Sequence, residues 1–441
     1  MSSYALVVWI ILLVVLLSVL WTHYDARRER ALHREVEELS GLGELLPPTL
    51  HPEIDPALCI GSGACVTACP EHDVLGLLQG RVQLVNPMGC VGHGACAAAC
   101  PAQAIRLVFG TKTRGLELPR IDRHFQTNQR GIYIAGELGG MGLIRNAVMQ
   151  GAQAAGHIVT GTDGQAPRRG QNGAYDALVV GAGPAGISAT LRLMEAGLDV
   201  MLVDQDTFGG TIMHYPRAKV VMTGDLPLPL FGTVKRRTMT RERLVDLCAD
   251  IQQRFRVPFE SHQLVRSVEA APDGMWLVRA EKREFRAANV VLALGTRGSP
   301  RRLGVPGEAL AKVHYRLLEP QEFANKHVLV VGGGNSAVET ALSLSDYGGC
   351  ASVAISYRRD QFMRCRADNR RRIDEVIKQA KVRAFMPTQV ERIEPSSVVL
   401  SDTSGARVLD NDAIIAQLGG TAPSDVLKSF GIELVTKYAE R

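Results

Sequence analysis

Six of the nine cysteines in this chain lie between Cys59 and Cys100. They form two runs that match at eight of twelve positions, Cys59-Ile-Gly-Ser62-Gly-Ala-Cys65-Val-Thr-Ala-Cys69-Pro70 and Cys90-Val-Gly-His93-Gly-Ala-Cys96-Ala-Ala-Ala-Cys100-Pro101. Thiolates on tight glycine-containing turns converge on one iron–sulfur cluster, and the cysteine before proline crosses to a second cluster. The spacing therefore predicts metal ligation rather than disulfide bonds.

The doubled run resembles that of bacterial two-cluster ferredoxins over residues 51–108, a small α+β fold. It departs from the pattern C-x2-C-x2-C-x3-C-P at one position in each run, where Ser62 and His93 replace cysteines. The crossover rule then leaves three thiolates for each cluster. The two predicted sets are Cys59, Cys65 and Cys100, and Cys90, Cys96 and Cys69.

Three outcomes remain open for these sets. Both clusters are 3Fe-4S, with Ser62 and His93 unligated; or one or both are 4Fe-4S, with the serine oxygen or the histidine nitrogen on the fourth iron; or the domain is a scaffold without metal. Imidazole binds iron in other clusters and raises their potential, so His93 is the better candidate ligand. Alternatively, His93 is only a polar residue beside an unligated corner of the cluster. Zinc is a poorer alternative, because six thiolates in two crossed sets, each run ending in Cys-Pro, match a ferredoxin better than a zinc ribbon.

A glycine-rich turn between an apolar strand and a helix is the second chemical signature. The strand from residue 176 runs into Gly181, Gly183 and Gly186, and the next strand ends at Asp204, 23 residues after Gly181. Such glycines let a pyrophosphate approach the helix N-terminus, and the acid accepts ribose hydroxyls. The pattern predicts a dinucleotide site on an α/β unit.

A similar turn follows about 150 residues later. The apolar strand from residue 327 leads into Gly332, Gly334, Asn335, Ser336 and Ala337. Here the second strand ends in arginines instead of an acid, at Arg358 and Arg359, with Arg364 close behind. Arginine accommodates a 2′-phosphate, so this site should prefer NADPH to NADH. The alternative is a solvated basic loop.

A pair of such sites resembles the thioredoxin-reductase-like branch of the two-dinucleotide-domain flavoproteins, over residues 175–441. The resemblance assigns FAD to the first site and NADPH to the second, each on a Rossmann-like three-layer α/β domain. It also implies flavin-loop roles for Gly209, Gly210, Thr211, Gly295 and Thr296. Relatives of this kind are often dimers, which makes a homodimer an expectation by analogy.

The order of segments departs from that family. Its closing FAD segment, T-x-x-x-G-(I/V)-Y-A-x-G-D, does not follow residue 423, and a match appears upstream at residues 127–137. There Gly136 is kept and Glu137 replaces the aspartate, before a helix pattern over residues 143–158. We therefore expect a permuted flavoprotein, although exchange of the segment between two chains would supply the same site.

A redox dithiol is also missing. The family's thioredoxin reductases carry C-x-x-C between the landmarks of their two domains, whereas residues 313–325 hold no cysteine. Cys350 and Cys365 are too far apart for that motif, and Cys248 is expected to be a buried small hydrophobe. The fused ferredoxin-like domain then replaces the dithiol as electron acceptor.

The N-terminal segment is apolar from residue 4 to residue 21, apart from Ser18, and arginines follow Asp25. Eighteen apolar residues reach the length of a membrane-spanning helix, and the following arginines place the later residues in the cytoplasm. We expect a single-pass inner-membrane anchor with its N-terminus outside and contacts to membrane lipid, rather than a cleaved signal peptide.

The whole chain is expected to contain several parts. The net charge of +5 gives no reason to expect a nucleic-acid partner. The expected segments are a transmembrane helix at 4–21, a juxtamembrane helix and linker at 22–50, the ferredoxin-like domain at 51–108, a permuted FAD segment at 109–160, a linker at 161–174, the FAD domain at 175–312, the NADPH domain at 313–408 and a return to the FAD domain at 409–441.

These parts predict an oxidoreductase that passes electrons from NADPH through FAD to two iron–sulfur clusters and on to a membrane-associated or soluble acceptor. The cofactors carry the chemistry, so no catalytic residue is assigned. Alternatives are reduction of NADP in the reverse direction, a thiol or disulfide reductase with structural or sensory clusters, and a non-catalytic subunit of a membrane complex.

Overall fold

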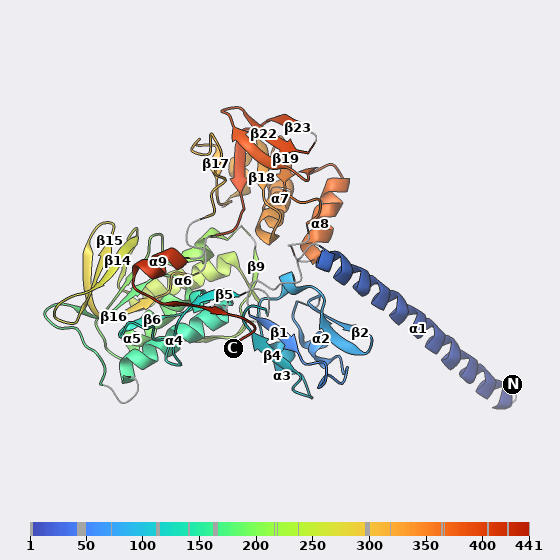
Figure 1. The fold of residues 1–441 in the computed structure, drawn as a ribbon, viewed down its shortest axis with the longest axis horizontal. Helices are drawn as coiled ribbons and strands as arrows, with labels where there is room; N and C mark the ends of the chain where they lie inside the picture. The colour runs from blue at the N-terminus through green and yellow to red at the C-terminus, as the bar shows by residue number, and fades with distance from the viewer. Residues whose placement is uncertain are drawn as a thin grey trace. The chain divides into compact units, whose positions relative to one another are not determined.

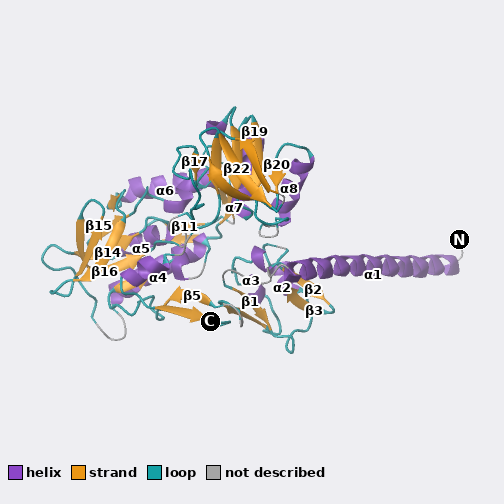
Figure 2. Ribbon diagram, turned by 45° about the horizontal axis from the view of Figure 1, so that its top comes forward, coloured by secondary structure: helices purple, strands orange, loops and turns teal. Residues whose placement is uncertain are grey.

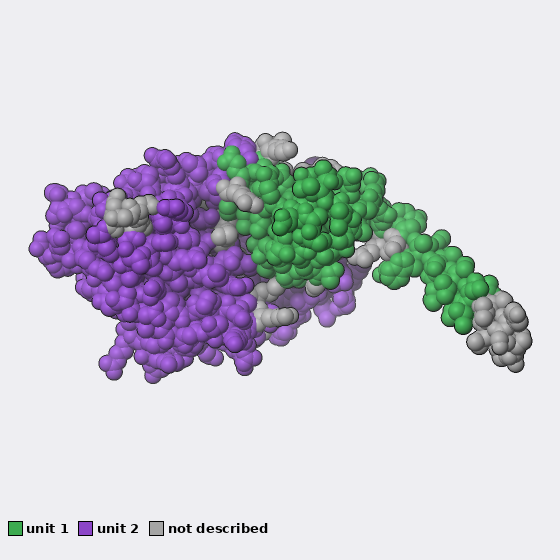
Figure 3. Space-filling view, turned by 90° about the horizontal axis from the view of Figure 1, so that it is seen from below, with its two compact units in different colours: residues 1–114, 439–441 green, residues 115–438 purple. Residues whose placement is uncertain are grey.

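The computed structural model describes residues 3–41, 50–71, 73–111, 115–139, 142–161, 166–215, 217, 219–236, 238–295, 300–317, 319–362, 365, 367–403, 405–420 and 423–440. The chain forms two compact units, coloured separately in Figure 3. The first unit comprises Met1–Arg114 with Ala439–Arg441, and the second comprises Gly115–Tyr438. The cysteine runs lie in the first unit and both glycine-rich turns lie in the second.

The first unit is a small α+β fold in which two hairpin-like strand pairs accompany two short helices (Figure 2). Its strands are antiparallel, β1 with β4 and β2 with β3. The elements are α1 (Ser3–Gly41), β1 (His51–Ile54), α2 (Ala64–Ala68), β2 (Leu75–Leu78), β3 (Arg81–Leu84), η1 (Pro87–Gly89), α3 (Ala95–Ala98) and β4 (Ile105–Val108). The core combines the cysteines with buried apolar side chains such as Val74, Leu75, Val82 and Ile105.

Helix α1 continues from the apolar N-terminal segment into the charged one without a break. Its apolar side chains from Trp9 to Trp21 are more than half exposed. Even so, within the described part of the chain no helix is long and apolar enough to cross a membrane. The expected anchor at residues 4–21, and with it the expected inner-membrane location, is therefore not supported. The linker residues 42–49 lie outside the described part.

The second unit contains a seven-stranded sheet that carries the first glycine-rich turn (Figure 1). Its order is β13-β8-β7-β16-β15-β14, and β6 also pairs with β16. The strands are β6 (Ile132–Ile134), β7 (Tyr175–Val180), β8 (Val200–Val203), β13 (Phe259–Glu260), β14 (Val265–Ala270), β15 (Trp276–Ala280) and β16 (Glu284–Leu292). Ala177 and Val179 face one apolar core while Leu178 and Val180 face another, so the sheet is covered on both sides.

The upstream segment joins this sheet within the same chain. Strand β6 runs parallel to β16, with Ile132 opposite Val290 and Ile134 opposite Leu292. Helix α4 (Ile144–Thr160) follows and packs against α5 (Pro184–Glu195), where the Ser188 hydroxyl donates to the Val148 carbonyl at 2.7 Å. Strand β6 and helix α4 thus join the first sheet and its covering helix within the same chain.

The other elements around the first sheet are η2 (Glu137–Gly139), η3 (Gly210–His214), β9 (Val220–Met222), β10 (Leu226–Leu228), β11 (Gly232–Val234), β12 (Thr238–Thr240) and α6 (Arg241–Phe255). Helix α6 begins at a Thr240 side chain that accepts from the Arg243 N–H, as an N-cap should. Its buried residues Leu244, Cys248 and Ile251 lie on one helical face and belong to the core around α5.

A five-stranded parallel sheet carries the second glycine-rich turn. Its order is β17-β24-β18-β19-β20. The elements of this region are β17 (Val313–His314), η4 (Pro320–Phe323), β18 (His327–Val331), α7 (Asn335–Tyr347), β19 (Ser352–Ser356), α8 (Ala367–Lys378), β20 (Arg383–Phe385), an antiparallel sheet of β21 (Gln389–Ile393), β22 (Ser397–Asp402) and β23 (Gly405–Asp410), and β24 (Ala413–Ala416).

The return of the chain to the first sheet begins later than residue 409. Strand β24 pairs with β17 and β18 in the second sheet, because its four buried residues fill the position beside β18. Helix α9 (Ser424–Ser429) and β25 (Leu434–Lys437) then return, and Leu427 and Phe430 enter the core of the first sheet. Strand β25 pairs antiparallel with β5 (Leu116–Pro119).

Candidate functional site

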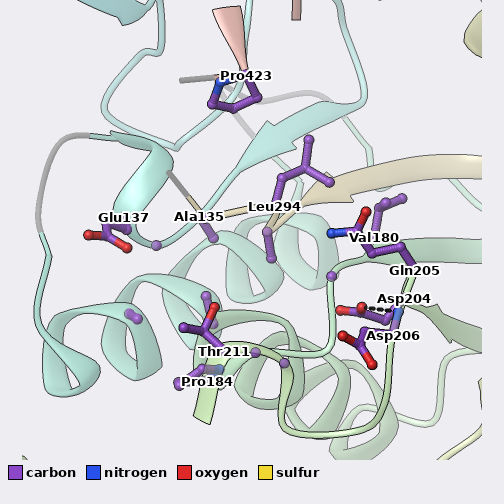
Figure 4. Close-up of a pocket in the computed structure, with 18 of the residues that line it drawn as sticks. Ala135, Glu137, Val180, Pro184, Asp204, Gln205, Asp206, Thr211, Leu294 and Pro423 are labelled. Atoms are coloured by element: carbon purple, nitrogen blue, oxygen red, sulfur yellow. Dashed lines mark hydrogen bonds between the residues drawn. The ribbon is translucent and has the colours of Figure 1, made fainter. Parts of the chain in front are cut away.

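A cavity of about 660 Å³ opens at the carboxyl ends of the first sheet (Figure 4). Segments far apart in the sequence line it: the glycine-rich turn, the end of β8, η3, the loop after β16, the start of α4 and the start of α9. Clefts at this edge of open α/β sheets are where dinucleotides bind, and the volume lies in the range of cofactor sites.

The glycine-rich turn fits a phosphate cradle. A Cβ on Gly181 would lie 2.3 Å from the Ala293 carbonyl oxygen, and one on Gly186 would lie 1.8 Å from the Gly181 oxygen. Gly183 instead faces open space and precedes α5, so the first-turn N–H groups of that helix are approachable. The first and third glycines are therefore required by packing, while the second leaves room for an anion at the helix N-terminus.

Asp204 stands at the end of β8, where the sequence expects the ribose acid. Its carboxylate accepts from the N–H of Ala182 at 2.6 Å and from the N–H of Asp206 at 2.7 Å. Burial raises the pKa of Asp204 against the opposing effect of these hydrogen bonds. The acid is thus held rigidly at the rim of the cavity, as Figure 4 shows.

The flavin-loop residues gather around the same cavity. Gly210 and Thr211 line it, and a Cβ on Gly210 would lie 3.1 Å from the Gly183 backbone. Gly209 has a φ of 107° and is the N-cap residue of η3, and Gly295 also lines the cavity. Thr296, expected beside them, lies outside the described residues.

The upstream segment supplies the opposite wall. Gly136 and Glu137 line the cavity, together with Leu143 and Ile144 at the start of α4. Glu137 is exposed, and Figure 4 shows its carboxylate on η2. The buried Gln150 of α4 holds this wall, because its side-chain oxygen accepts from the Gly136 N–H at 2.9 Å. Sequence reasoning missed Gln150, whose only signal is an amide on the apolar face of a helix.

A charged cluster in the cavity was also not anticipated. His214 Nε2 lies 2.5 Å from Asp206 Oδ2, and Arg316 lies 3.1 Å from the same carboxylate. Although burial opposes ionisation, His214 and then Arg316 lower the pKa of Asp206. The three side chains come from the loop after β8, from η3 and from the segment after β17, so only the tertiary fold brings them together.

The second glycine-rich turn has the same construction. A Cβ on Gly332 would lie 2.4 Å from the Gln417 oxygen, and one on Gly333 would meet the Tyr357 ring at 2.4 Å. Gly334 faces open space at the start of α7, where Asn335 and Ser336 follow and Ala337 is buried. The turn is therefore packed on one side and accessible at the helix N-terminus.

The arginines expected at a 2′-phosphate lie just past β19. Arg358 is exposed and Arg359 is half-buried, beside the buried Tyr357 that packs on Gly333. Parallel pairing of β18 with β19 puts these residues at the same sheet edge as the second turn. Arg364 lies outside the described residues.

The cysteines of the first unit occupy matching positions in the two repeats. Cys65 and Cys96 are each the second residue of a short helix, and a left-handed glycine precedes each helix, Gly63 at φ 69° and Gly94 at φ 78°. Thiols on such turns are the donors that iron–sulfur clusters use. The described side chains form no closed group of three or more His, Cys, Asp or Glu arranged around a metal ion.

Electrostatic effects connect thiols within each crossed set and also between the sets, since the pKa of Cys96, raised first by burial, is raised further by Cys69 and by Cys65. Burial raises the pKa of Cys65, and after opposing backbone hydrogen bonds Cys100 and Cys59 raise it further. Burial likewise raises the pKa of Cys90 to about 11, with Cys96 and Cys69 adding to the rise. Thiolates that repel one another in this way are stabilised by iron, so the donor chemistry fits iron–sulfur ligation.

The remaining thiols do not form a redox pair. Cys248 and Cys365 are buried, and burial raises the pKa of each to about 12. A thiol with such a pKa is a poor nucleophile at neutral pH. These cysteines therefore act as small apolar core residues.

Comparison with known proteins places the chain in a family. Residues 178–439 match the family model of pyridine nucleotide-disulphide oxidoreductases, and residues 51–101 match a 4Fe-4S dicluster domain. The chain is 30% identical to a ferredoxin–NADP reductase of Ignicoccus hospitalis over 263 residues, which cover 59% of this chain and 82% of that protein. It is 25% identical to the bacilliredoxin reductase Bdr of Bacillus subtilis, over 58% of this chain and 81% of the relative.

Among solved structures, the bacillithiol disulfide reductase Bdr of Staphylococcus aureus is similar in fold. It aligns with a TM-score of 0.52 at 20% identity, over 59% of this chain and 80% of that one. The chain thus belongs to the pyridine nucleotide-disulphide oxidoreductase family. It is an NAD(P)H-dependent flavin oxidoreductase with a 4Fe-4S ferredoxin-type domain, as the two glycine-rich turns and the cysteine runs led us to expect.

Proposed function

We propose that this protein transfers electrons from NADPH, through FAD in the 660 Å³ cavity, to two iron–sulfur clusters in the cysteine unit and on to a separate redox partner. Bound FAD supplies hydride acceptance and one-electron release, and the protein supplies binding and orientation. The proposed division is a ferredoxin-like domain at 51–108, a FAD domain formed by 109–160, 175–312 and the end of the chain, and an NADPH domain from 313, with 161–174 as linker.

The observation that carries this proposal is the covalent link between the cysteine unit and one wall of the cavity. The ferredoxin-like strand β4 ends at Val108, and the chain then enters β5, β6 and the cavity-lining Gly136 and Glu137. In the family's usual order the matching segment comes last. Permutation therefore tethers the clusters directly to the segment that faces the flavin.

The chain's own residues have separate roles in this proposal. Gly181, Gly183 and Gly186 admit the FAD pyrophosphate, Asp204 accepts from its ribose, and Gly209, Gly210, Thr211, Gly295 and Thr296 surround the remaining cofactor. Gly332, Gly334, Asn335, Ser336 and Ala337 form the NADPH turn, and Arg358, Arg359 and Arg364 neutralise its 2′-phosphate. Glu137 and the start of α4 complete the FAD wall.

An anaerobic titration tests this route. NADPH should bleach the flavin absorbance of the full chain and change the cluster EPR spectrum in the same sample. Cys69→Ala should keep flavin bleaching and lose part of the cluster signal, while Cys248→Ala, which alters only a core thiol, should keep both. Clusters that stay unchanged while the flavin bleaches would refute the route.

The reverse direction is the second candidate. It is favoured by the relative from Ignicoccus hospitalis, a ferredoxin–NADP reductase. A reduced low-potential ferredoxin should then produce NADPH with this protein. A disulfide reductase has less support, because Cys248 and Cys365 have pKa values raised to about 12 by burial and no described thiol pair replaces the family's dithiol.

A further inference from the structure

The two cysteine turns are built alike, so the residues that replace the second cysteines are directly comparable. Gly61 and Gly63 both have φ 69°, and Gly92 and Gly94 have φ 76° and 78°. Ser62 and His93 therefore stand at equivalent points of two left-handed turns, each leading into a short helix that carries a cysteine. Any difference between the two sites comes from their side chains and surroundings.

Those surroundings differ. Ser62 is exposed, and its neighbour Ile60 is 71% exposed. The His93 side chain is only 17% exposed, and a Cβ on its neighbour Gly92 would lie 3.0 Å from the Leu50 carbonyl oxygen. Backbone from another segment covers both turns, since a Cβ on Gly61 would lie 2.1 Å from the Gly80 carbonyl oxygen. The difference lies in the side chains: Ser62 is exposed, whereas His93 is largely covered.

His93 also faces the thiols of one crossed set. A small cavity in the first unit is lined by Cys69, Cys90 and Cys96, together with His93 and Glu71. Imidazole is an established donor to iron in iron–sulfur centres. A solvent-facing serine hydroxyl, with its high pKa, is a much weaker donor.

A carboxylate stands next to this histidine. His93 Nε2 lies 4.0 Å from Glu71 Oε1, and the Glu71 side chain is 8% exposed. Metal-binding histidines commonly direct their second ring nitrogen to a carboxylate, which fixes the ring orientation and strengthens the donor. Glu71 follows Pro70 directly after Cys69, so one short segment supplies both a thiol and this carboxylate.

We propose that His93, oriented by Glu71, is the fourth protein ligand of the cluster held by Cys69, Cys90 and Cys96, and that the corner beside Ser62 has no protein ligand. The inference rests on the proposed clusters and makes them unequal: one 4Fe-4S cluster with a nitrogen ligand, and one 3Fe-4S cluster open to solvent. A neutral imidazole in place of a thiolate raises the potential of the first cluster.

The test uses the full chain, purified anaerobically and reduced with dithionite so that it does not depend on NADPH. Pulsed EPR should show coupling of a ¹⁴N nucleus to one cluster, and iron analysis should give about seven irons per chain. His93→Ala should remove the coupling and lower the count to about six. His93→Cys should restore the iron, remove the coupling and lower the midpoint potential.

The equivalent position in the other repeat provides the matched variants. Ser62→Ala should leave both iron content and nitrogen coupling unchanged, while Ser62→Cys should raise the count to about eight. The EPR signal of the unaltered cluster identifies variants in which the first unit is folded. Clusters without nitrogen coupling, or a coupling that survives in His93→Ala, overturn this inference and leave the electron route standing. If the nitrogen coupling is found but NADPH fails to reduce the clusters, the assignment of His93 as a ligand stands and the proposed electron route from NADPH is wrong.

Discussion

At the residue scale, two kinds of position define the proposed nucleotide sites: glycines that leave no room for a side chain, and arginines that supply positive charge. Gly186 and Gly332 have carbonyl oxygens where a Cβ would stand, so both turns require glycine. Arg358 is exposed and Arg359 is half-buried just past β19. In the proposed site both side chains contact the 2′-phosphate of NADPH, so replacing them tests the choice of nucleotide.

Replacing both arginines with alanine should change nucleotide choice. Charged hydrogen bonds to a phosphate contribute about 1.5–3 kcal/mol, so kcat/KM for NADPH should fall roughly tenfold or more. The value for NADH, which lacks the 2′-phosphate, should stay nearly constant. Steady-state kinetics with a one-electron dye measure both, and Arg383→Ala, on an exposed position of β20, is the control. Equal loss with both nucleotides would contradict a phosphate contact.

At the element scale, helix α4 carries one wall of the 660 Å³ cavity, the proposed FAD site, and packs against α5. A Cβ on Gly151 would lie 2.0 Å from the Ala185 carbonyl oxygen, whereas one on Gly156 would meet nothing within 4 Å. The two glycines of one helix therefore differ in purpose: the first permits close packing and the second only lowers helix propensity.

Gly151→Ala should destabilise the second unit by about 1–3 kcal/mol through overpacking and should loosen FAD. Gly156→Ala should be neutral or stabilising, by up to about 1 kcal/mol. Denaturant unfolding, followed by flavin fluorescence, compares them. Similar stabilities for the two variants would show that α4 does not pack against α5 as described.

The end of α4 should also make stability depend on pH. His157 Nδ1 lies 3.3 Å from His124 Nδ1, and burial, followed by repulsion from His124, lowers the pKa of His157 against the opposing effect of Asp122. The folded state therefore disfavours the protonated ring. The contribution of His157 to the free energy of unfolding is therefore fully present above pH 6.5, its pKa in the unfolded chain. This contribution is lost as the pH falls toward the lower pKa of the folded state.

His157→Gln should flatten this part of the stability profile, measured by thermal unfolding across pH 5–8. His262→Gln, at an exposed position of the same unit, should leave the slope unchanged. A slope that persists in His157→Gln would assign the pH dependence to other groups.

At the scale of the whole molecule, the pairing of β25 with β5 indicates how the proposed permutation can be reversed. Lys437 of β25 lies opposite Leu116 of β5 in an antiparallel pair. Residues opposite each other in such a pair are about 5 Å apart, so a two-residue turn can join the strands. The second unit, Gly115–Tyr438, can therefore be closed where the ferredoxin-like unit is now attached.

A rearranged chain, residues 166–438 followed by Asn-Gly and residues 115–161, should fold and bind FAD in a 1:1 ratio. NADPH should bleach its flavin, but dye reduction through the clusters should be lost. Absorbance and size-exclusion chromatography check stoichiometry and compactness. A soluble product without flavin would mean that residues 115–161 complete the site in another way.

Several features were readable from the sequence because local chemistry determines them. The glycine turns, Asp204, the arginines after β19 and the doubled cysteine run depend on spacing within short segments, and the elements around them form as expected. The upstream match to the family's closing segment predicted that residues 109–160 belong with the first dinucleotide domain, and the pairing of β6 with β16 agrees with this. The membrane anchor was wrong, as no described helix is long and apolar enough.

Other features were decided only by the tertiary structure. Asp206, His214 and Arg316 meet across more than a hundred residues, and Gln150 holds Gly136 from another element. Strand β24 pairs with β18 in the second sheet. This pairing depends on the neighbouring strand, so the local sequence of β24 does not predict it. The difference in exposure between Ser62 and His93 likewise comes from folding: the two runs match at eight of twelve positions, and only the tertiary structure covers the His93 side chain while leaving Ser62 exposed.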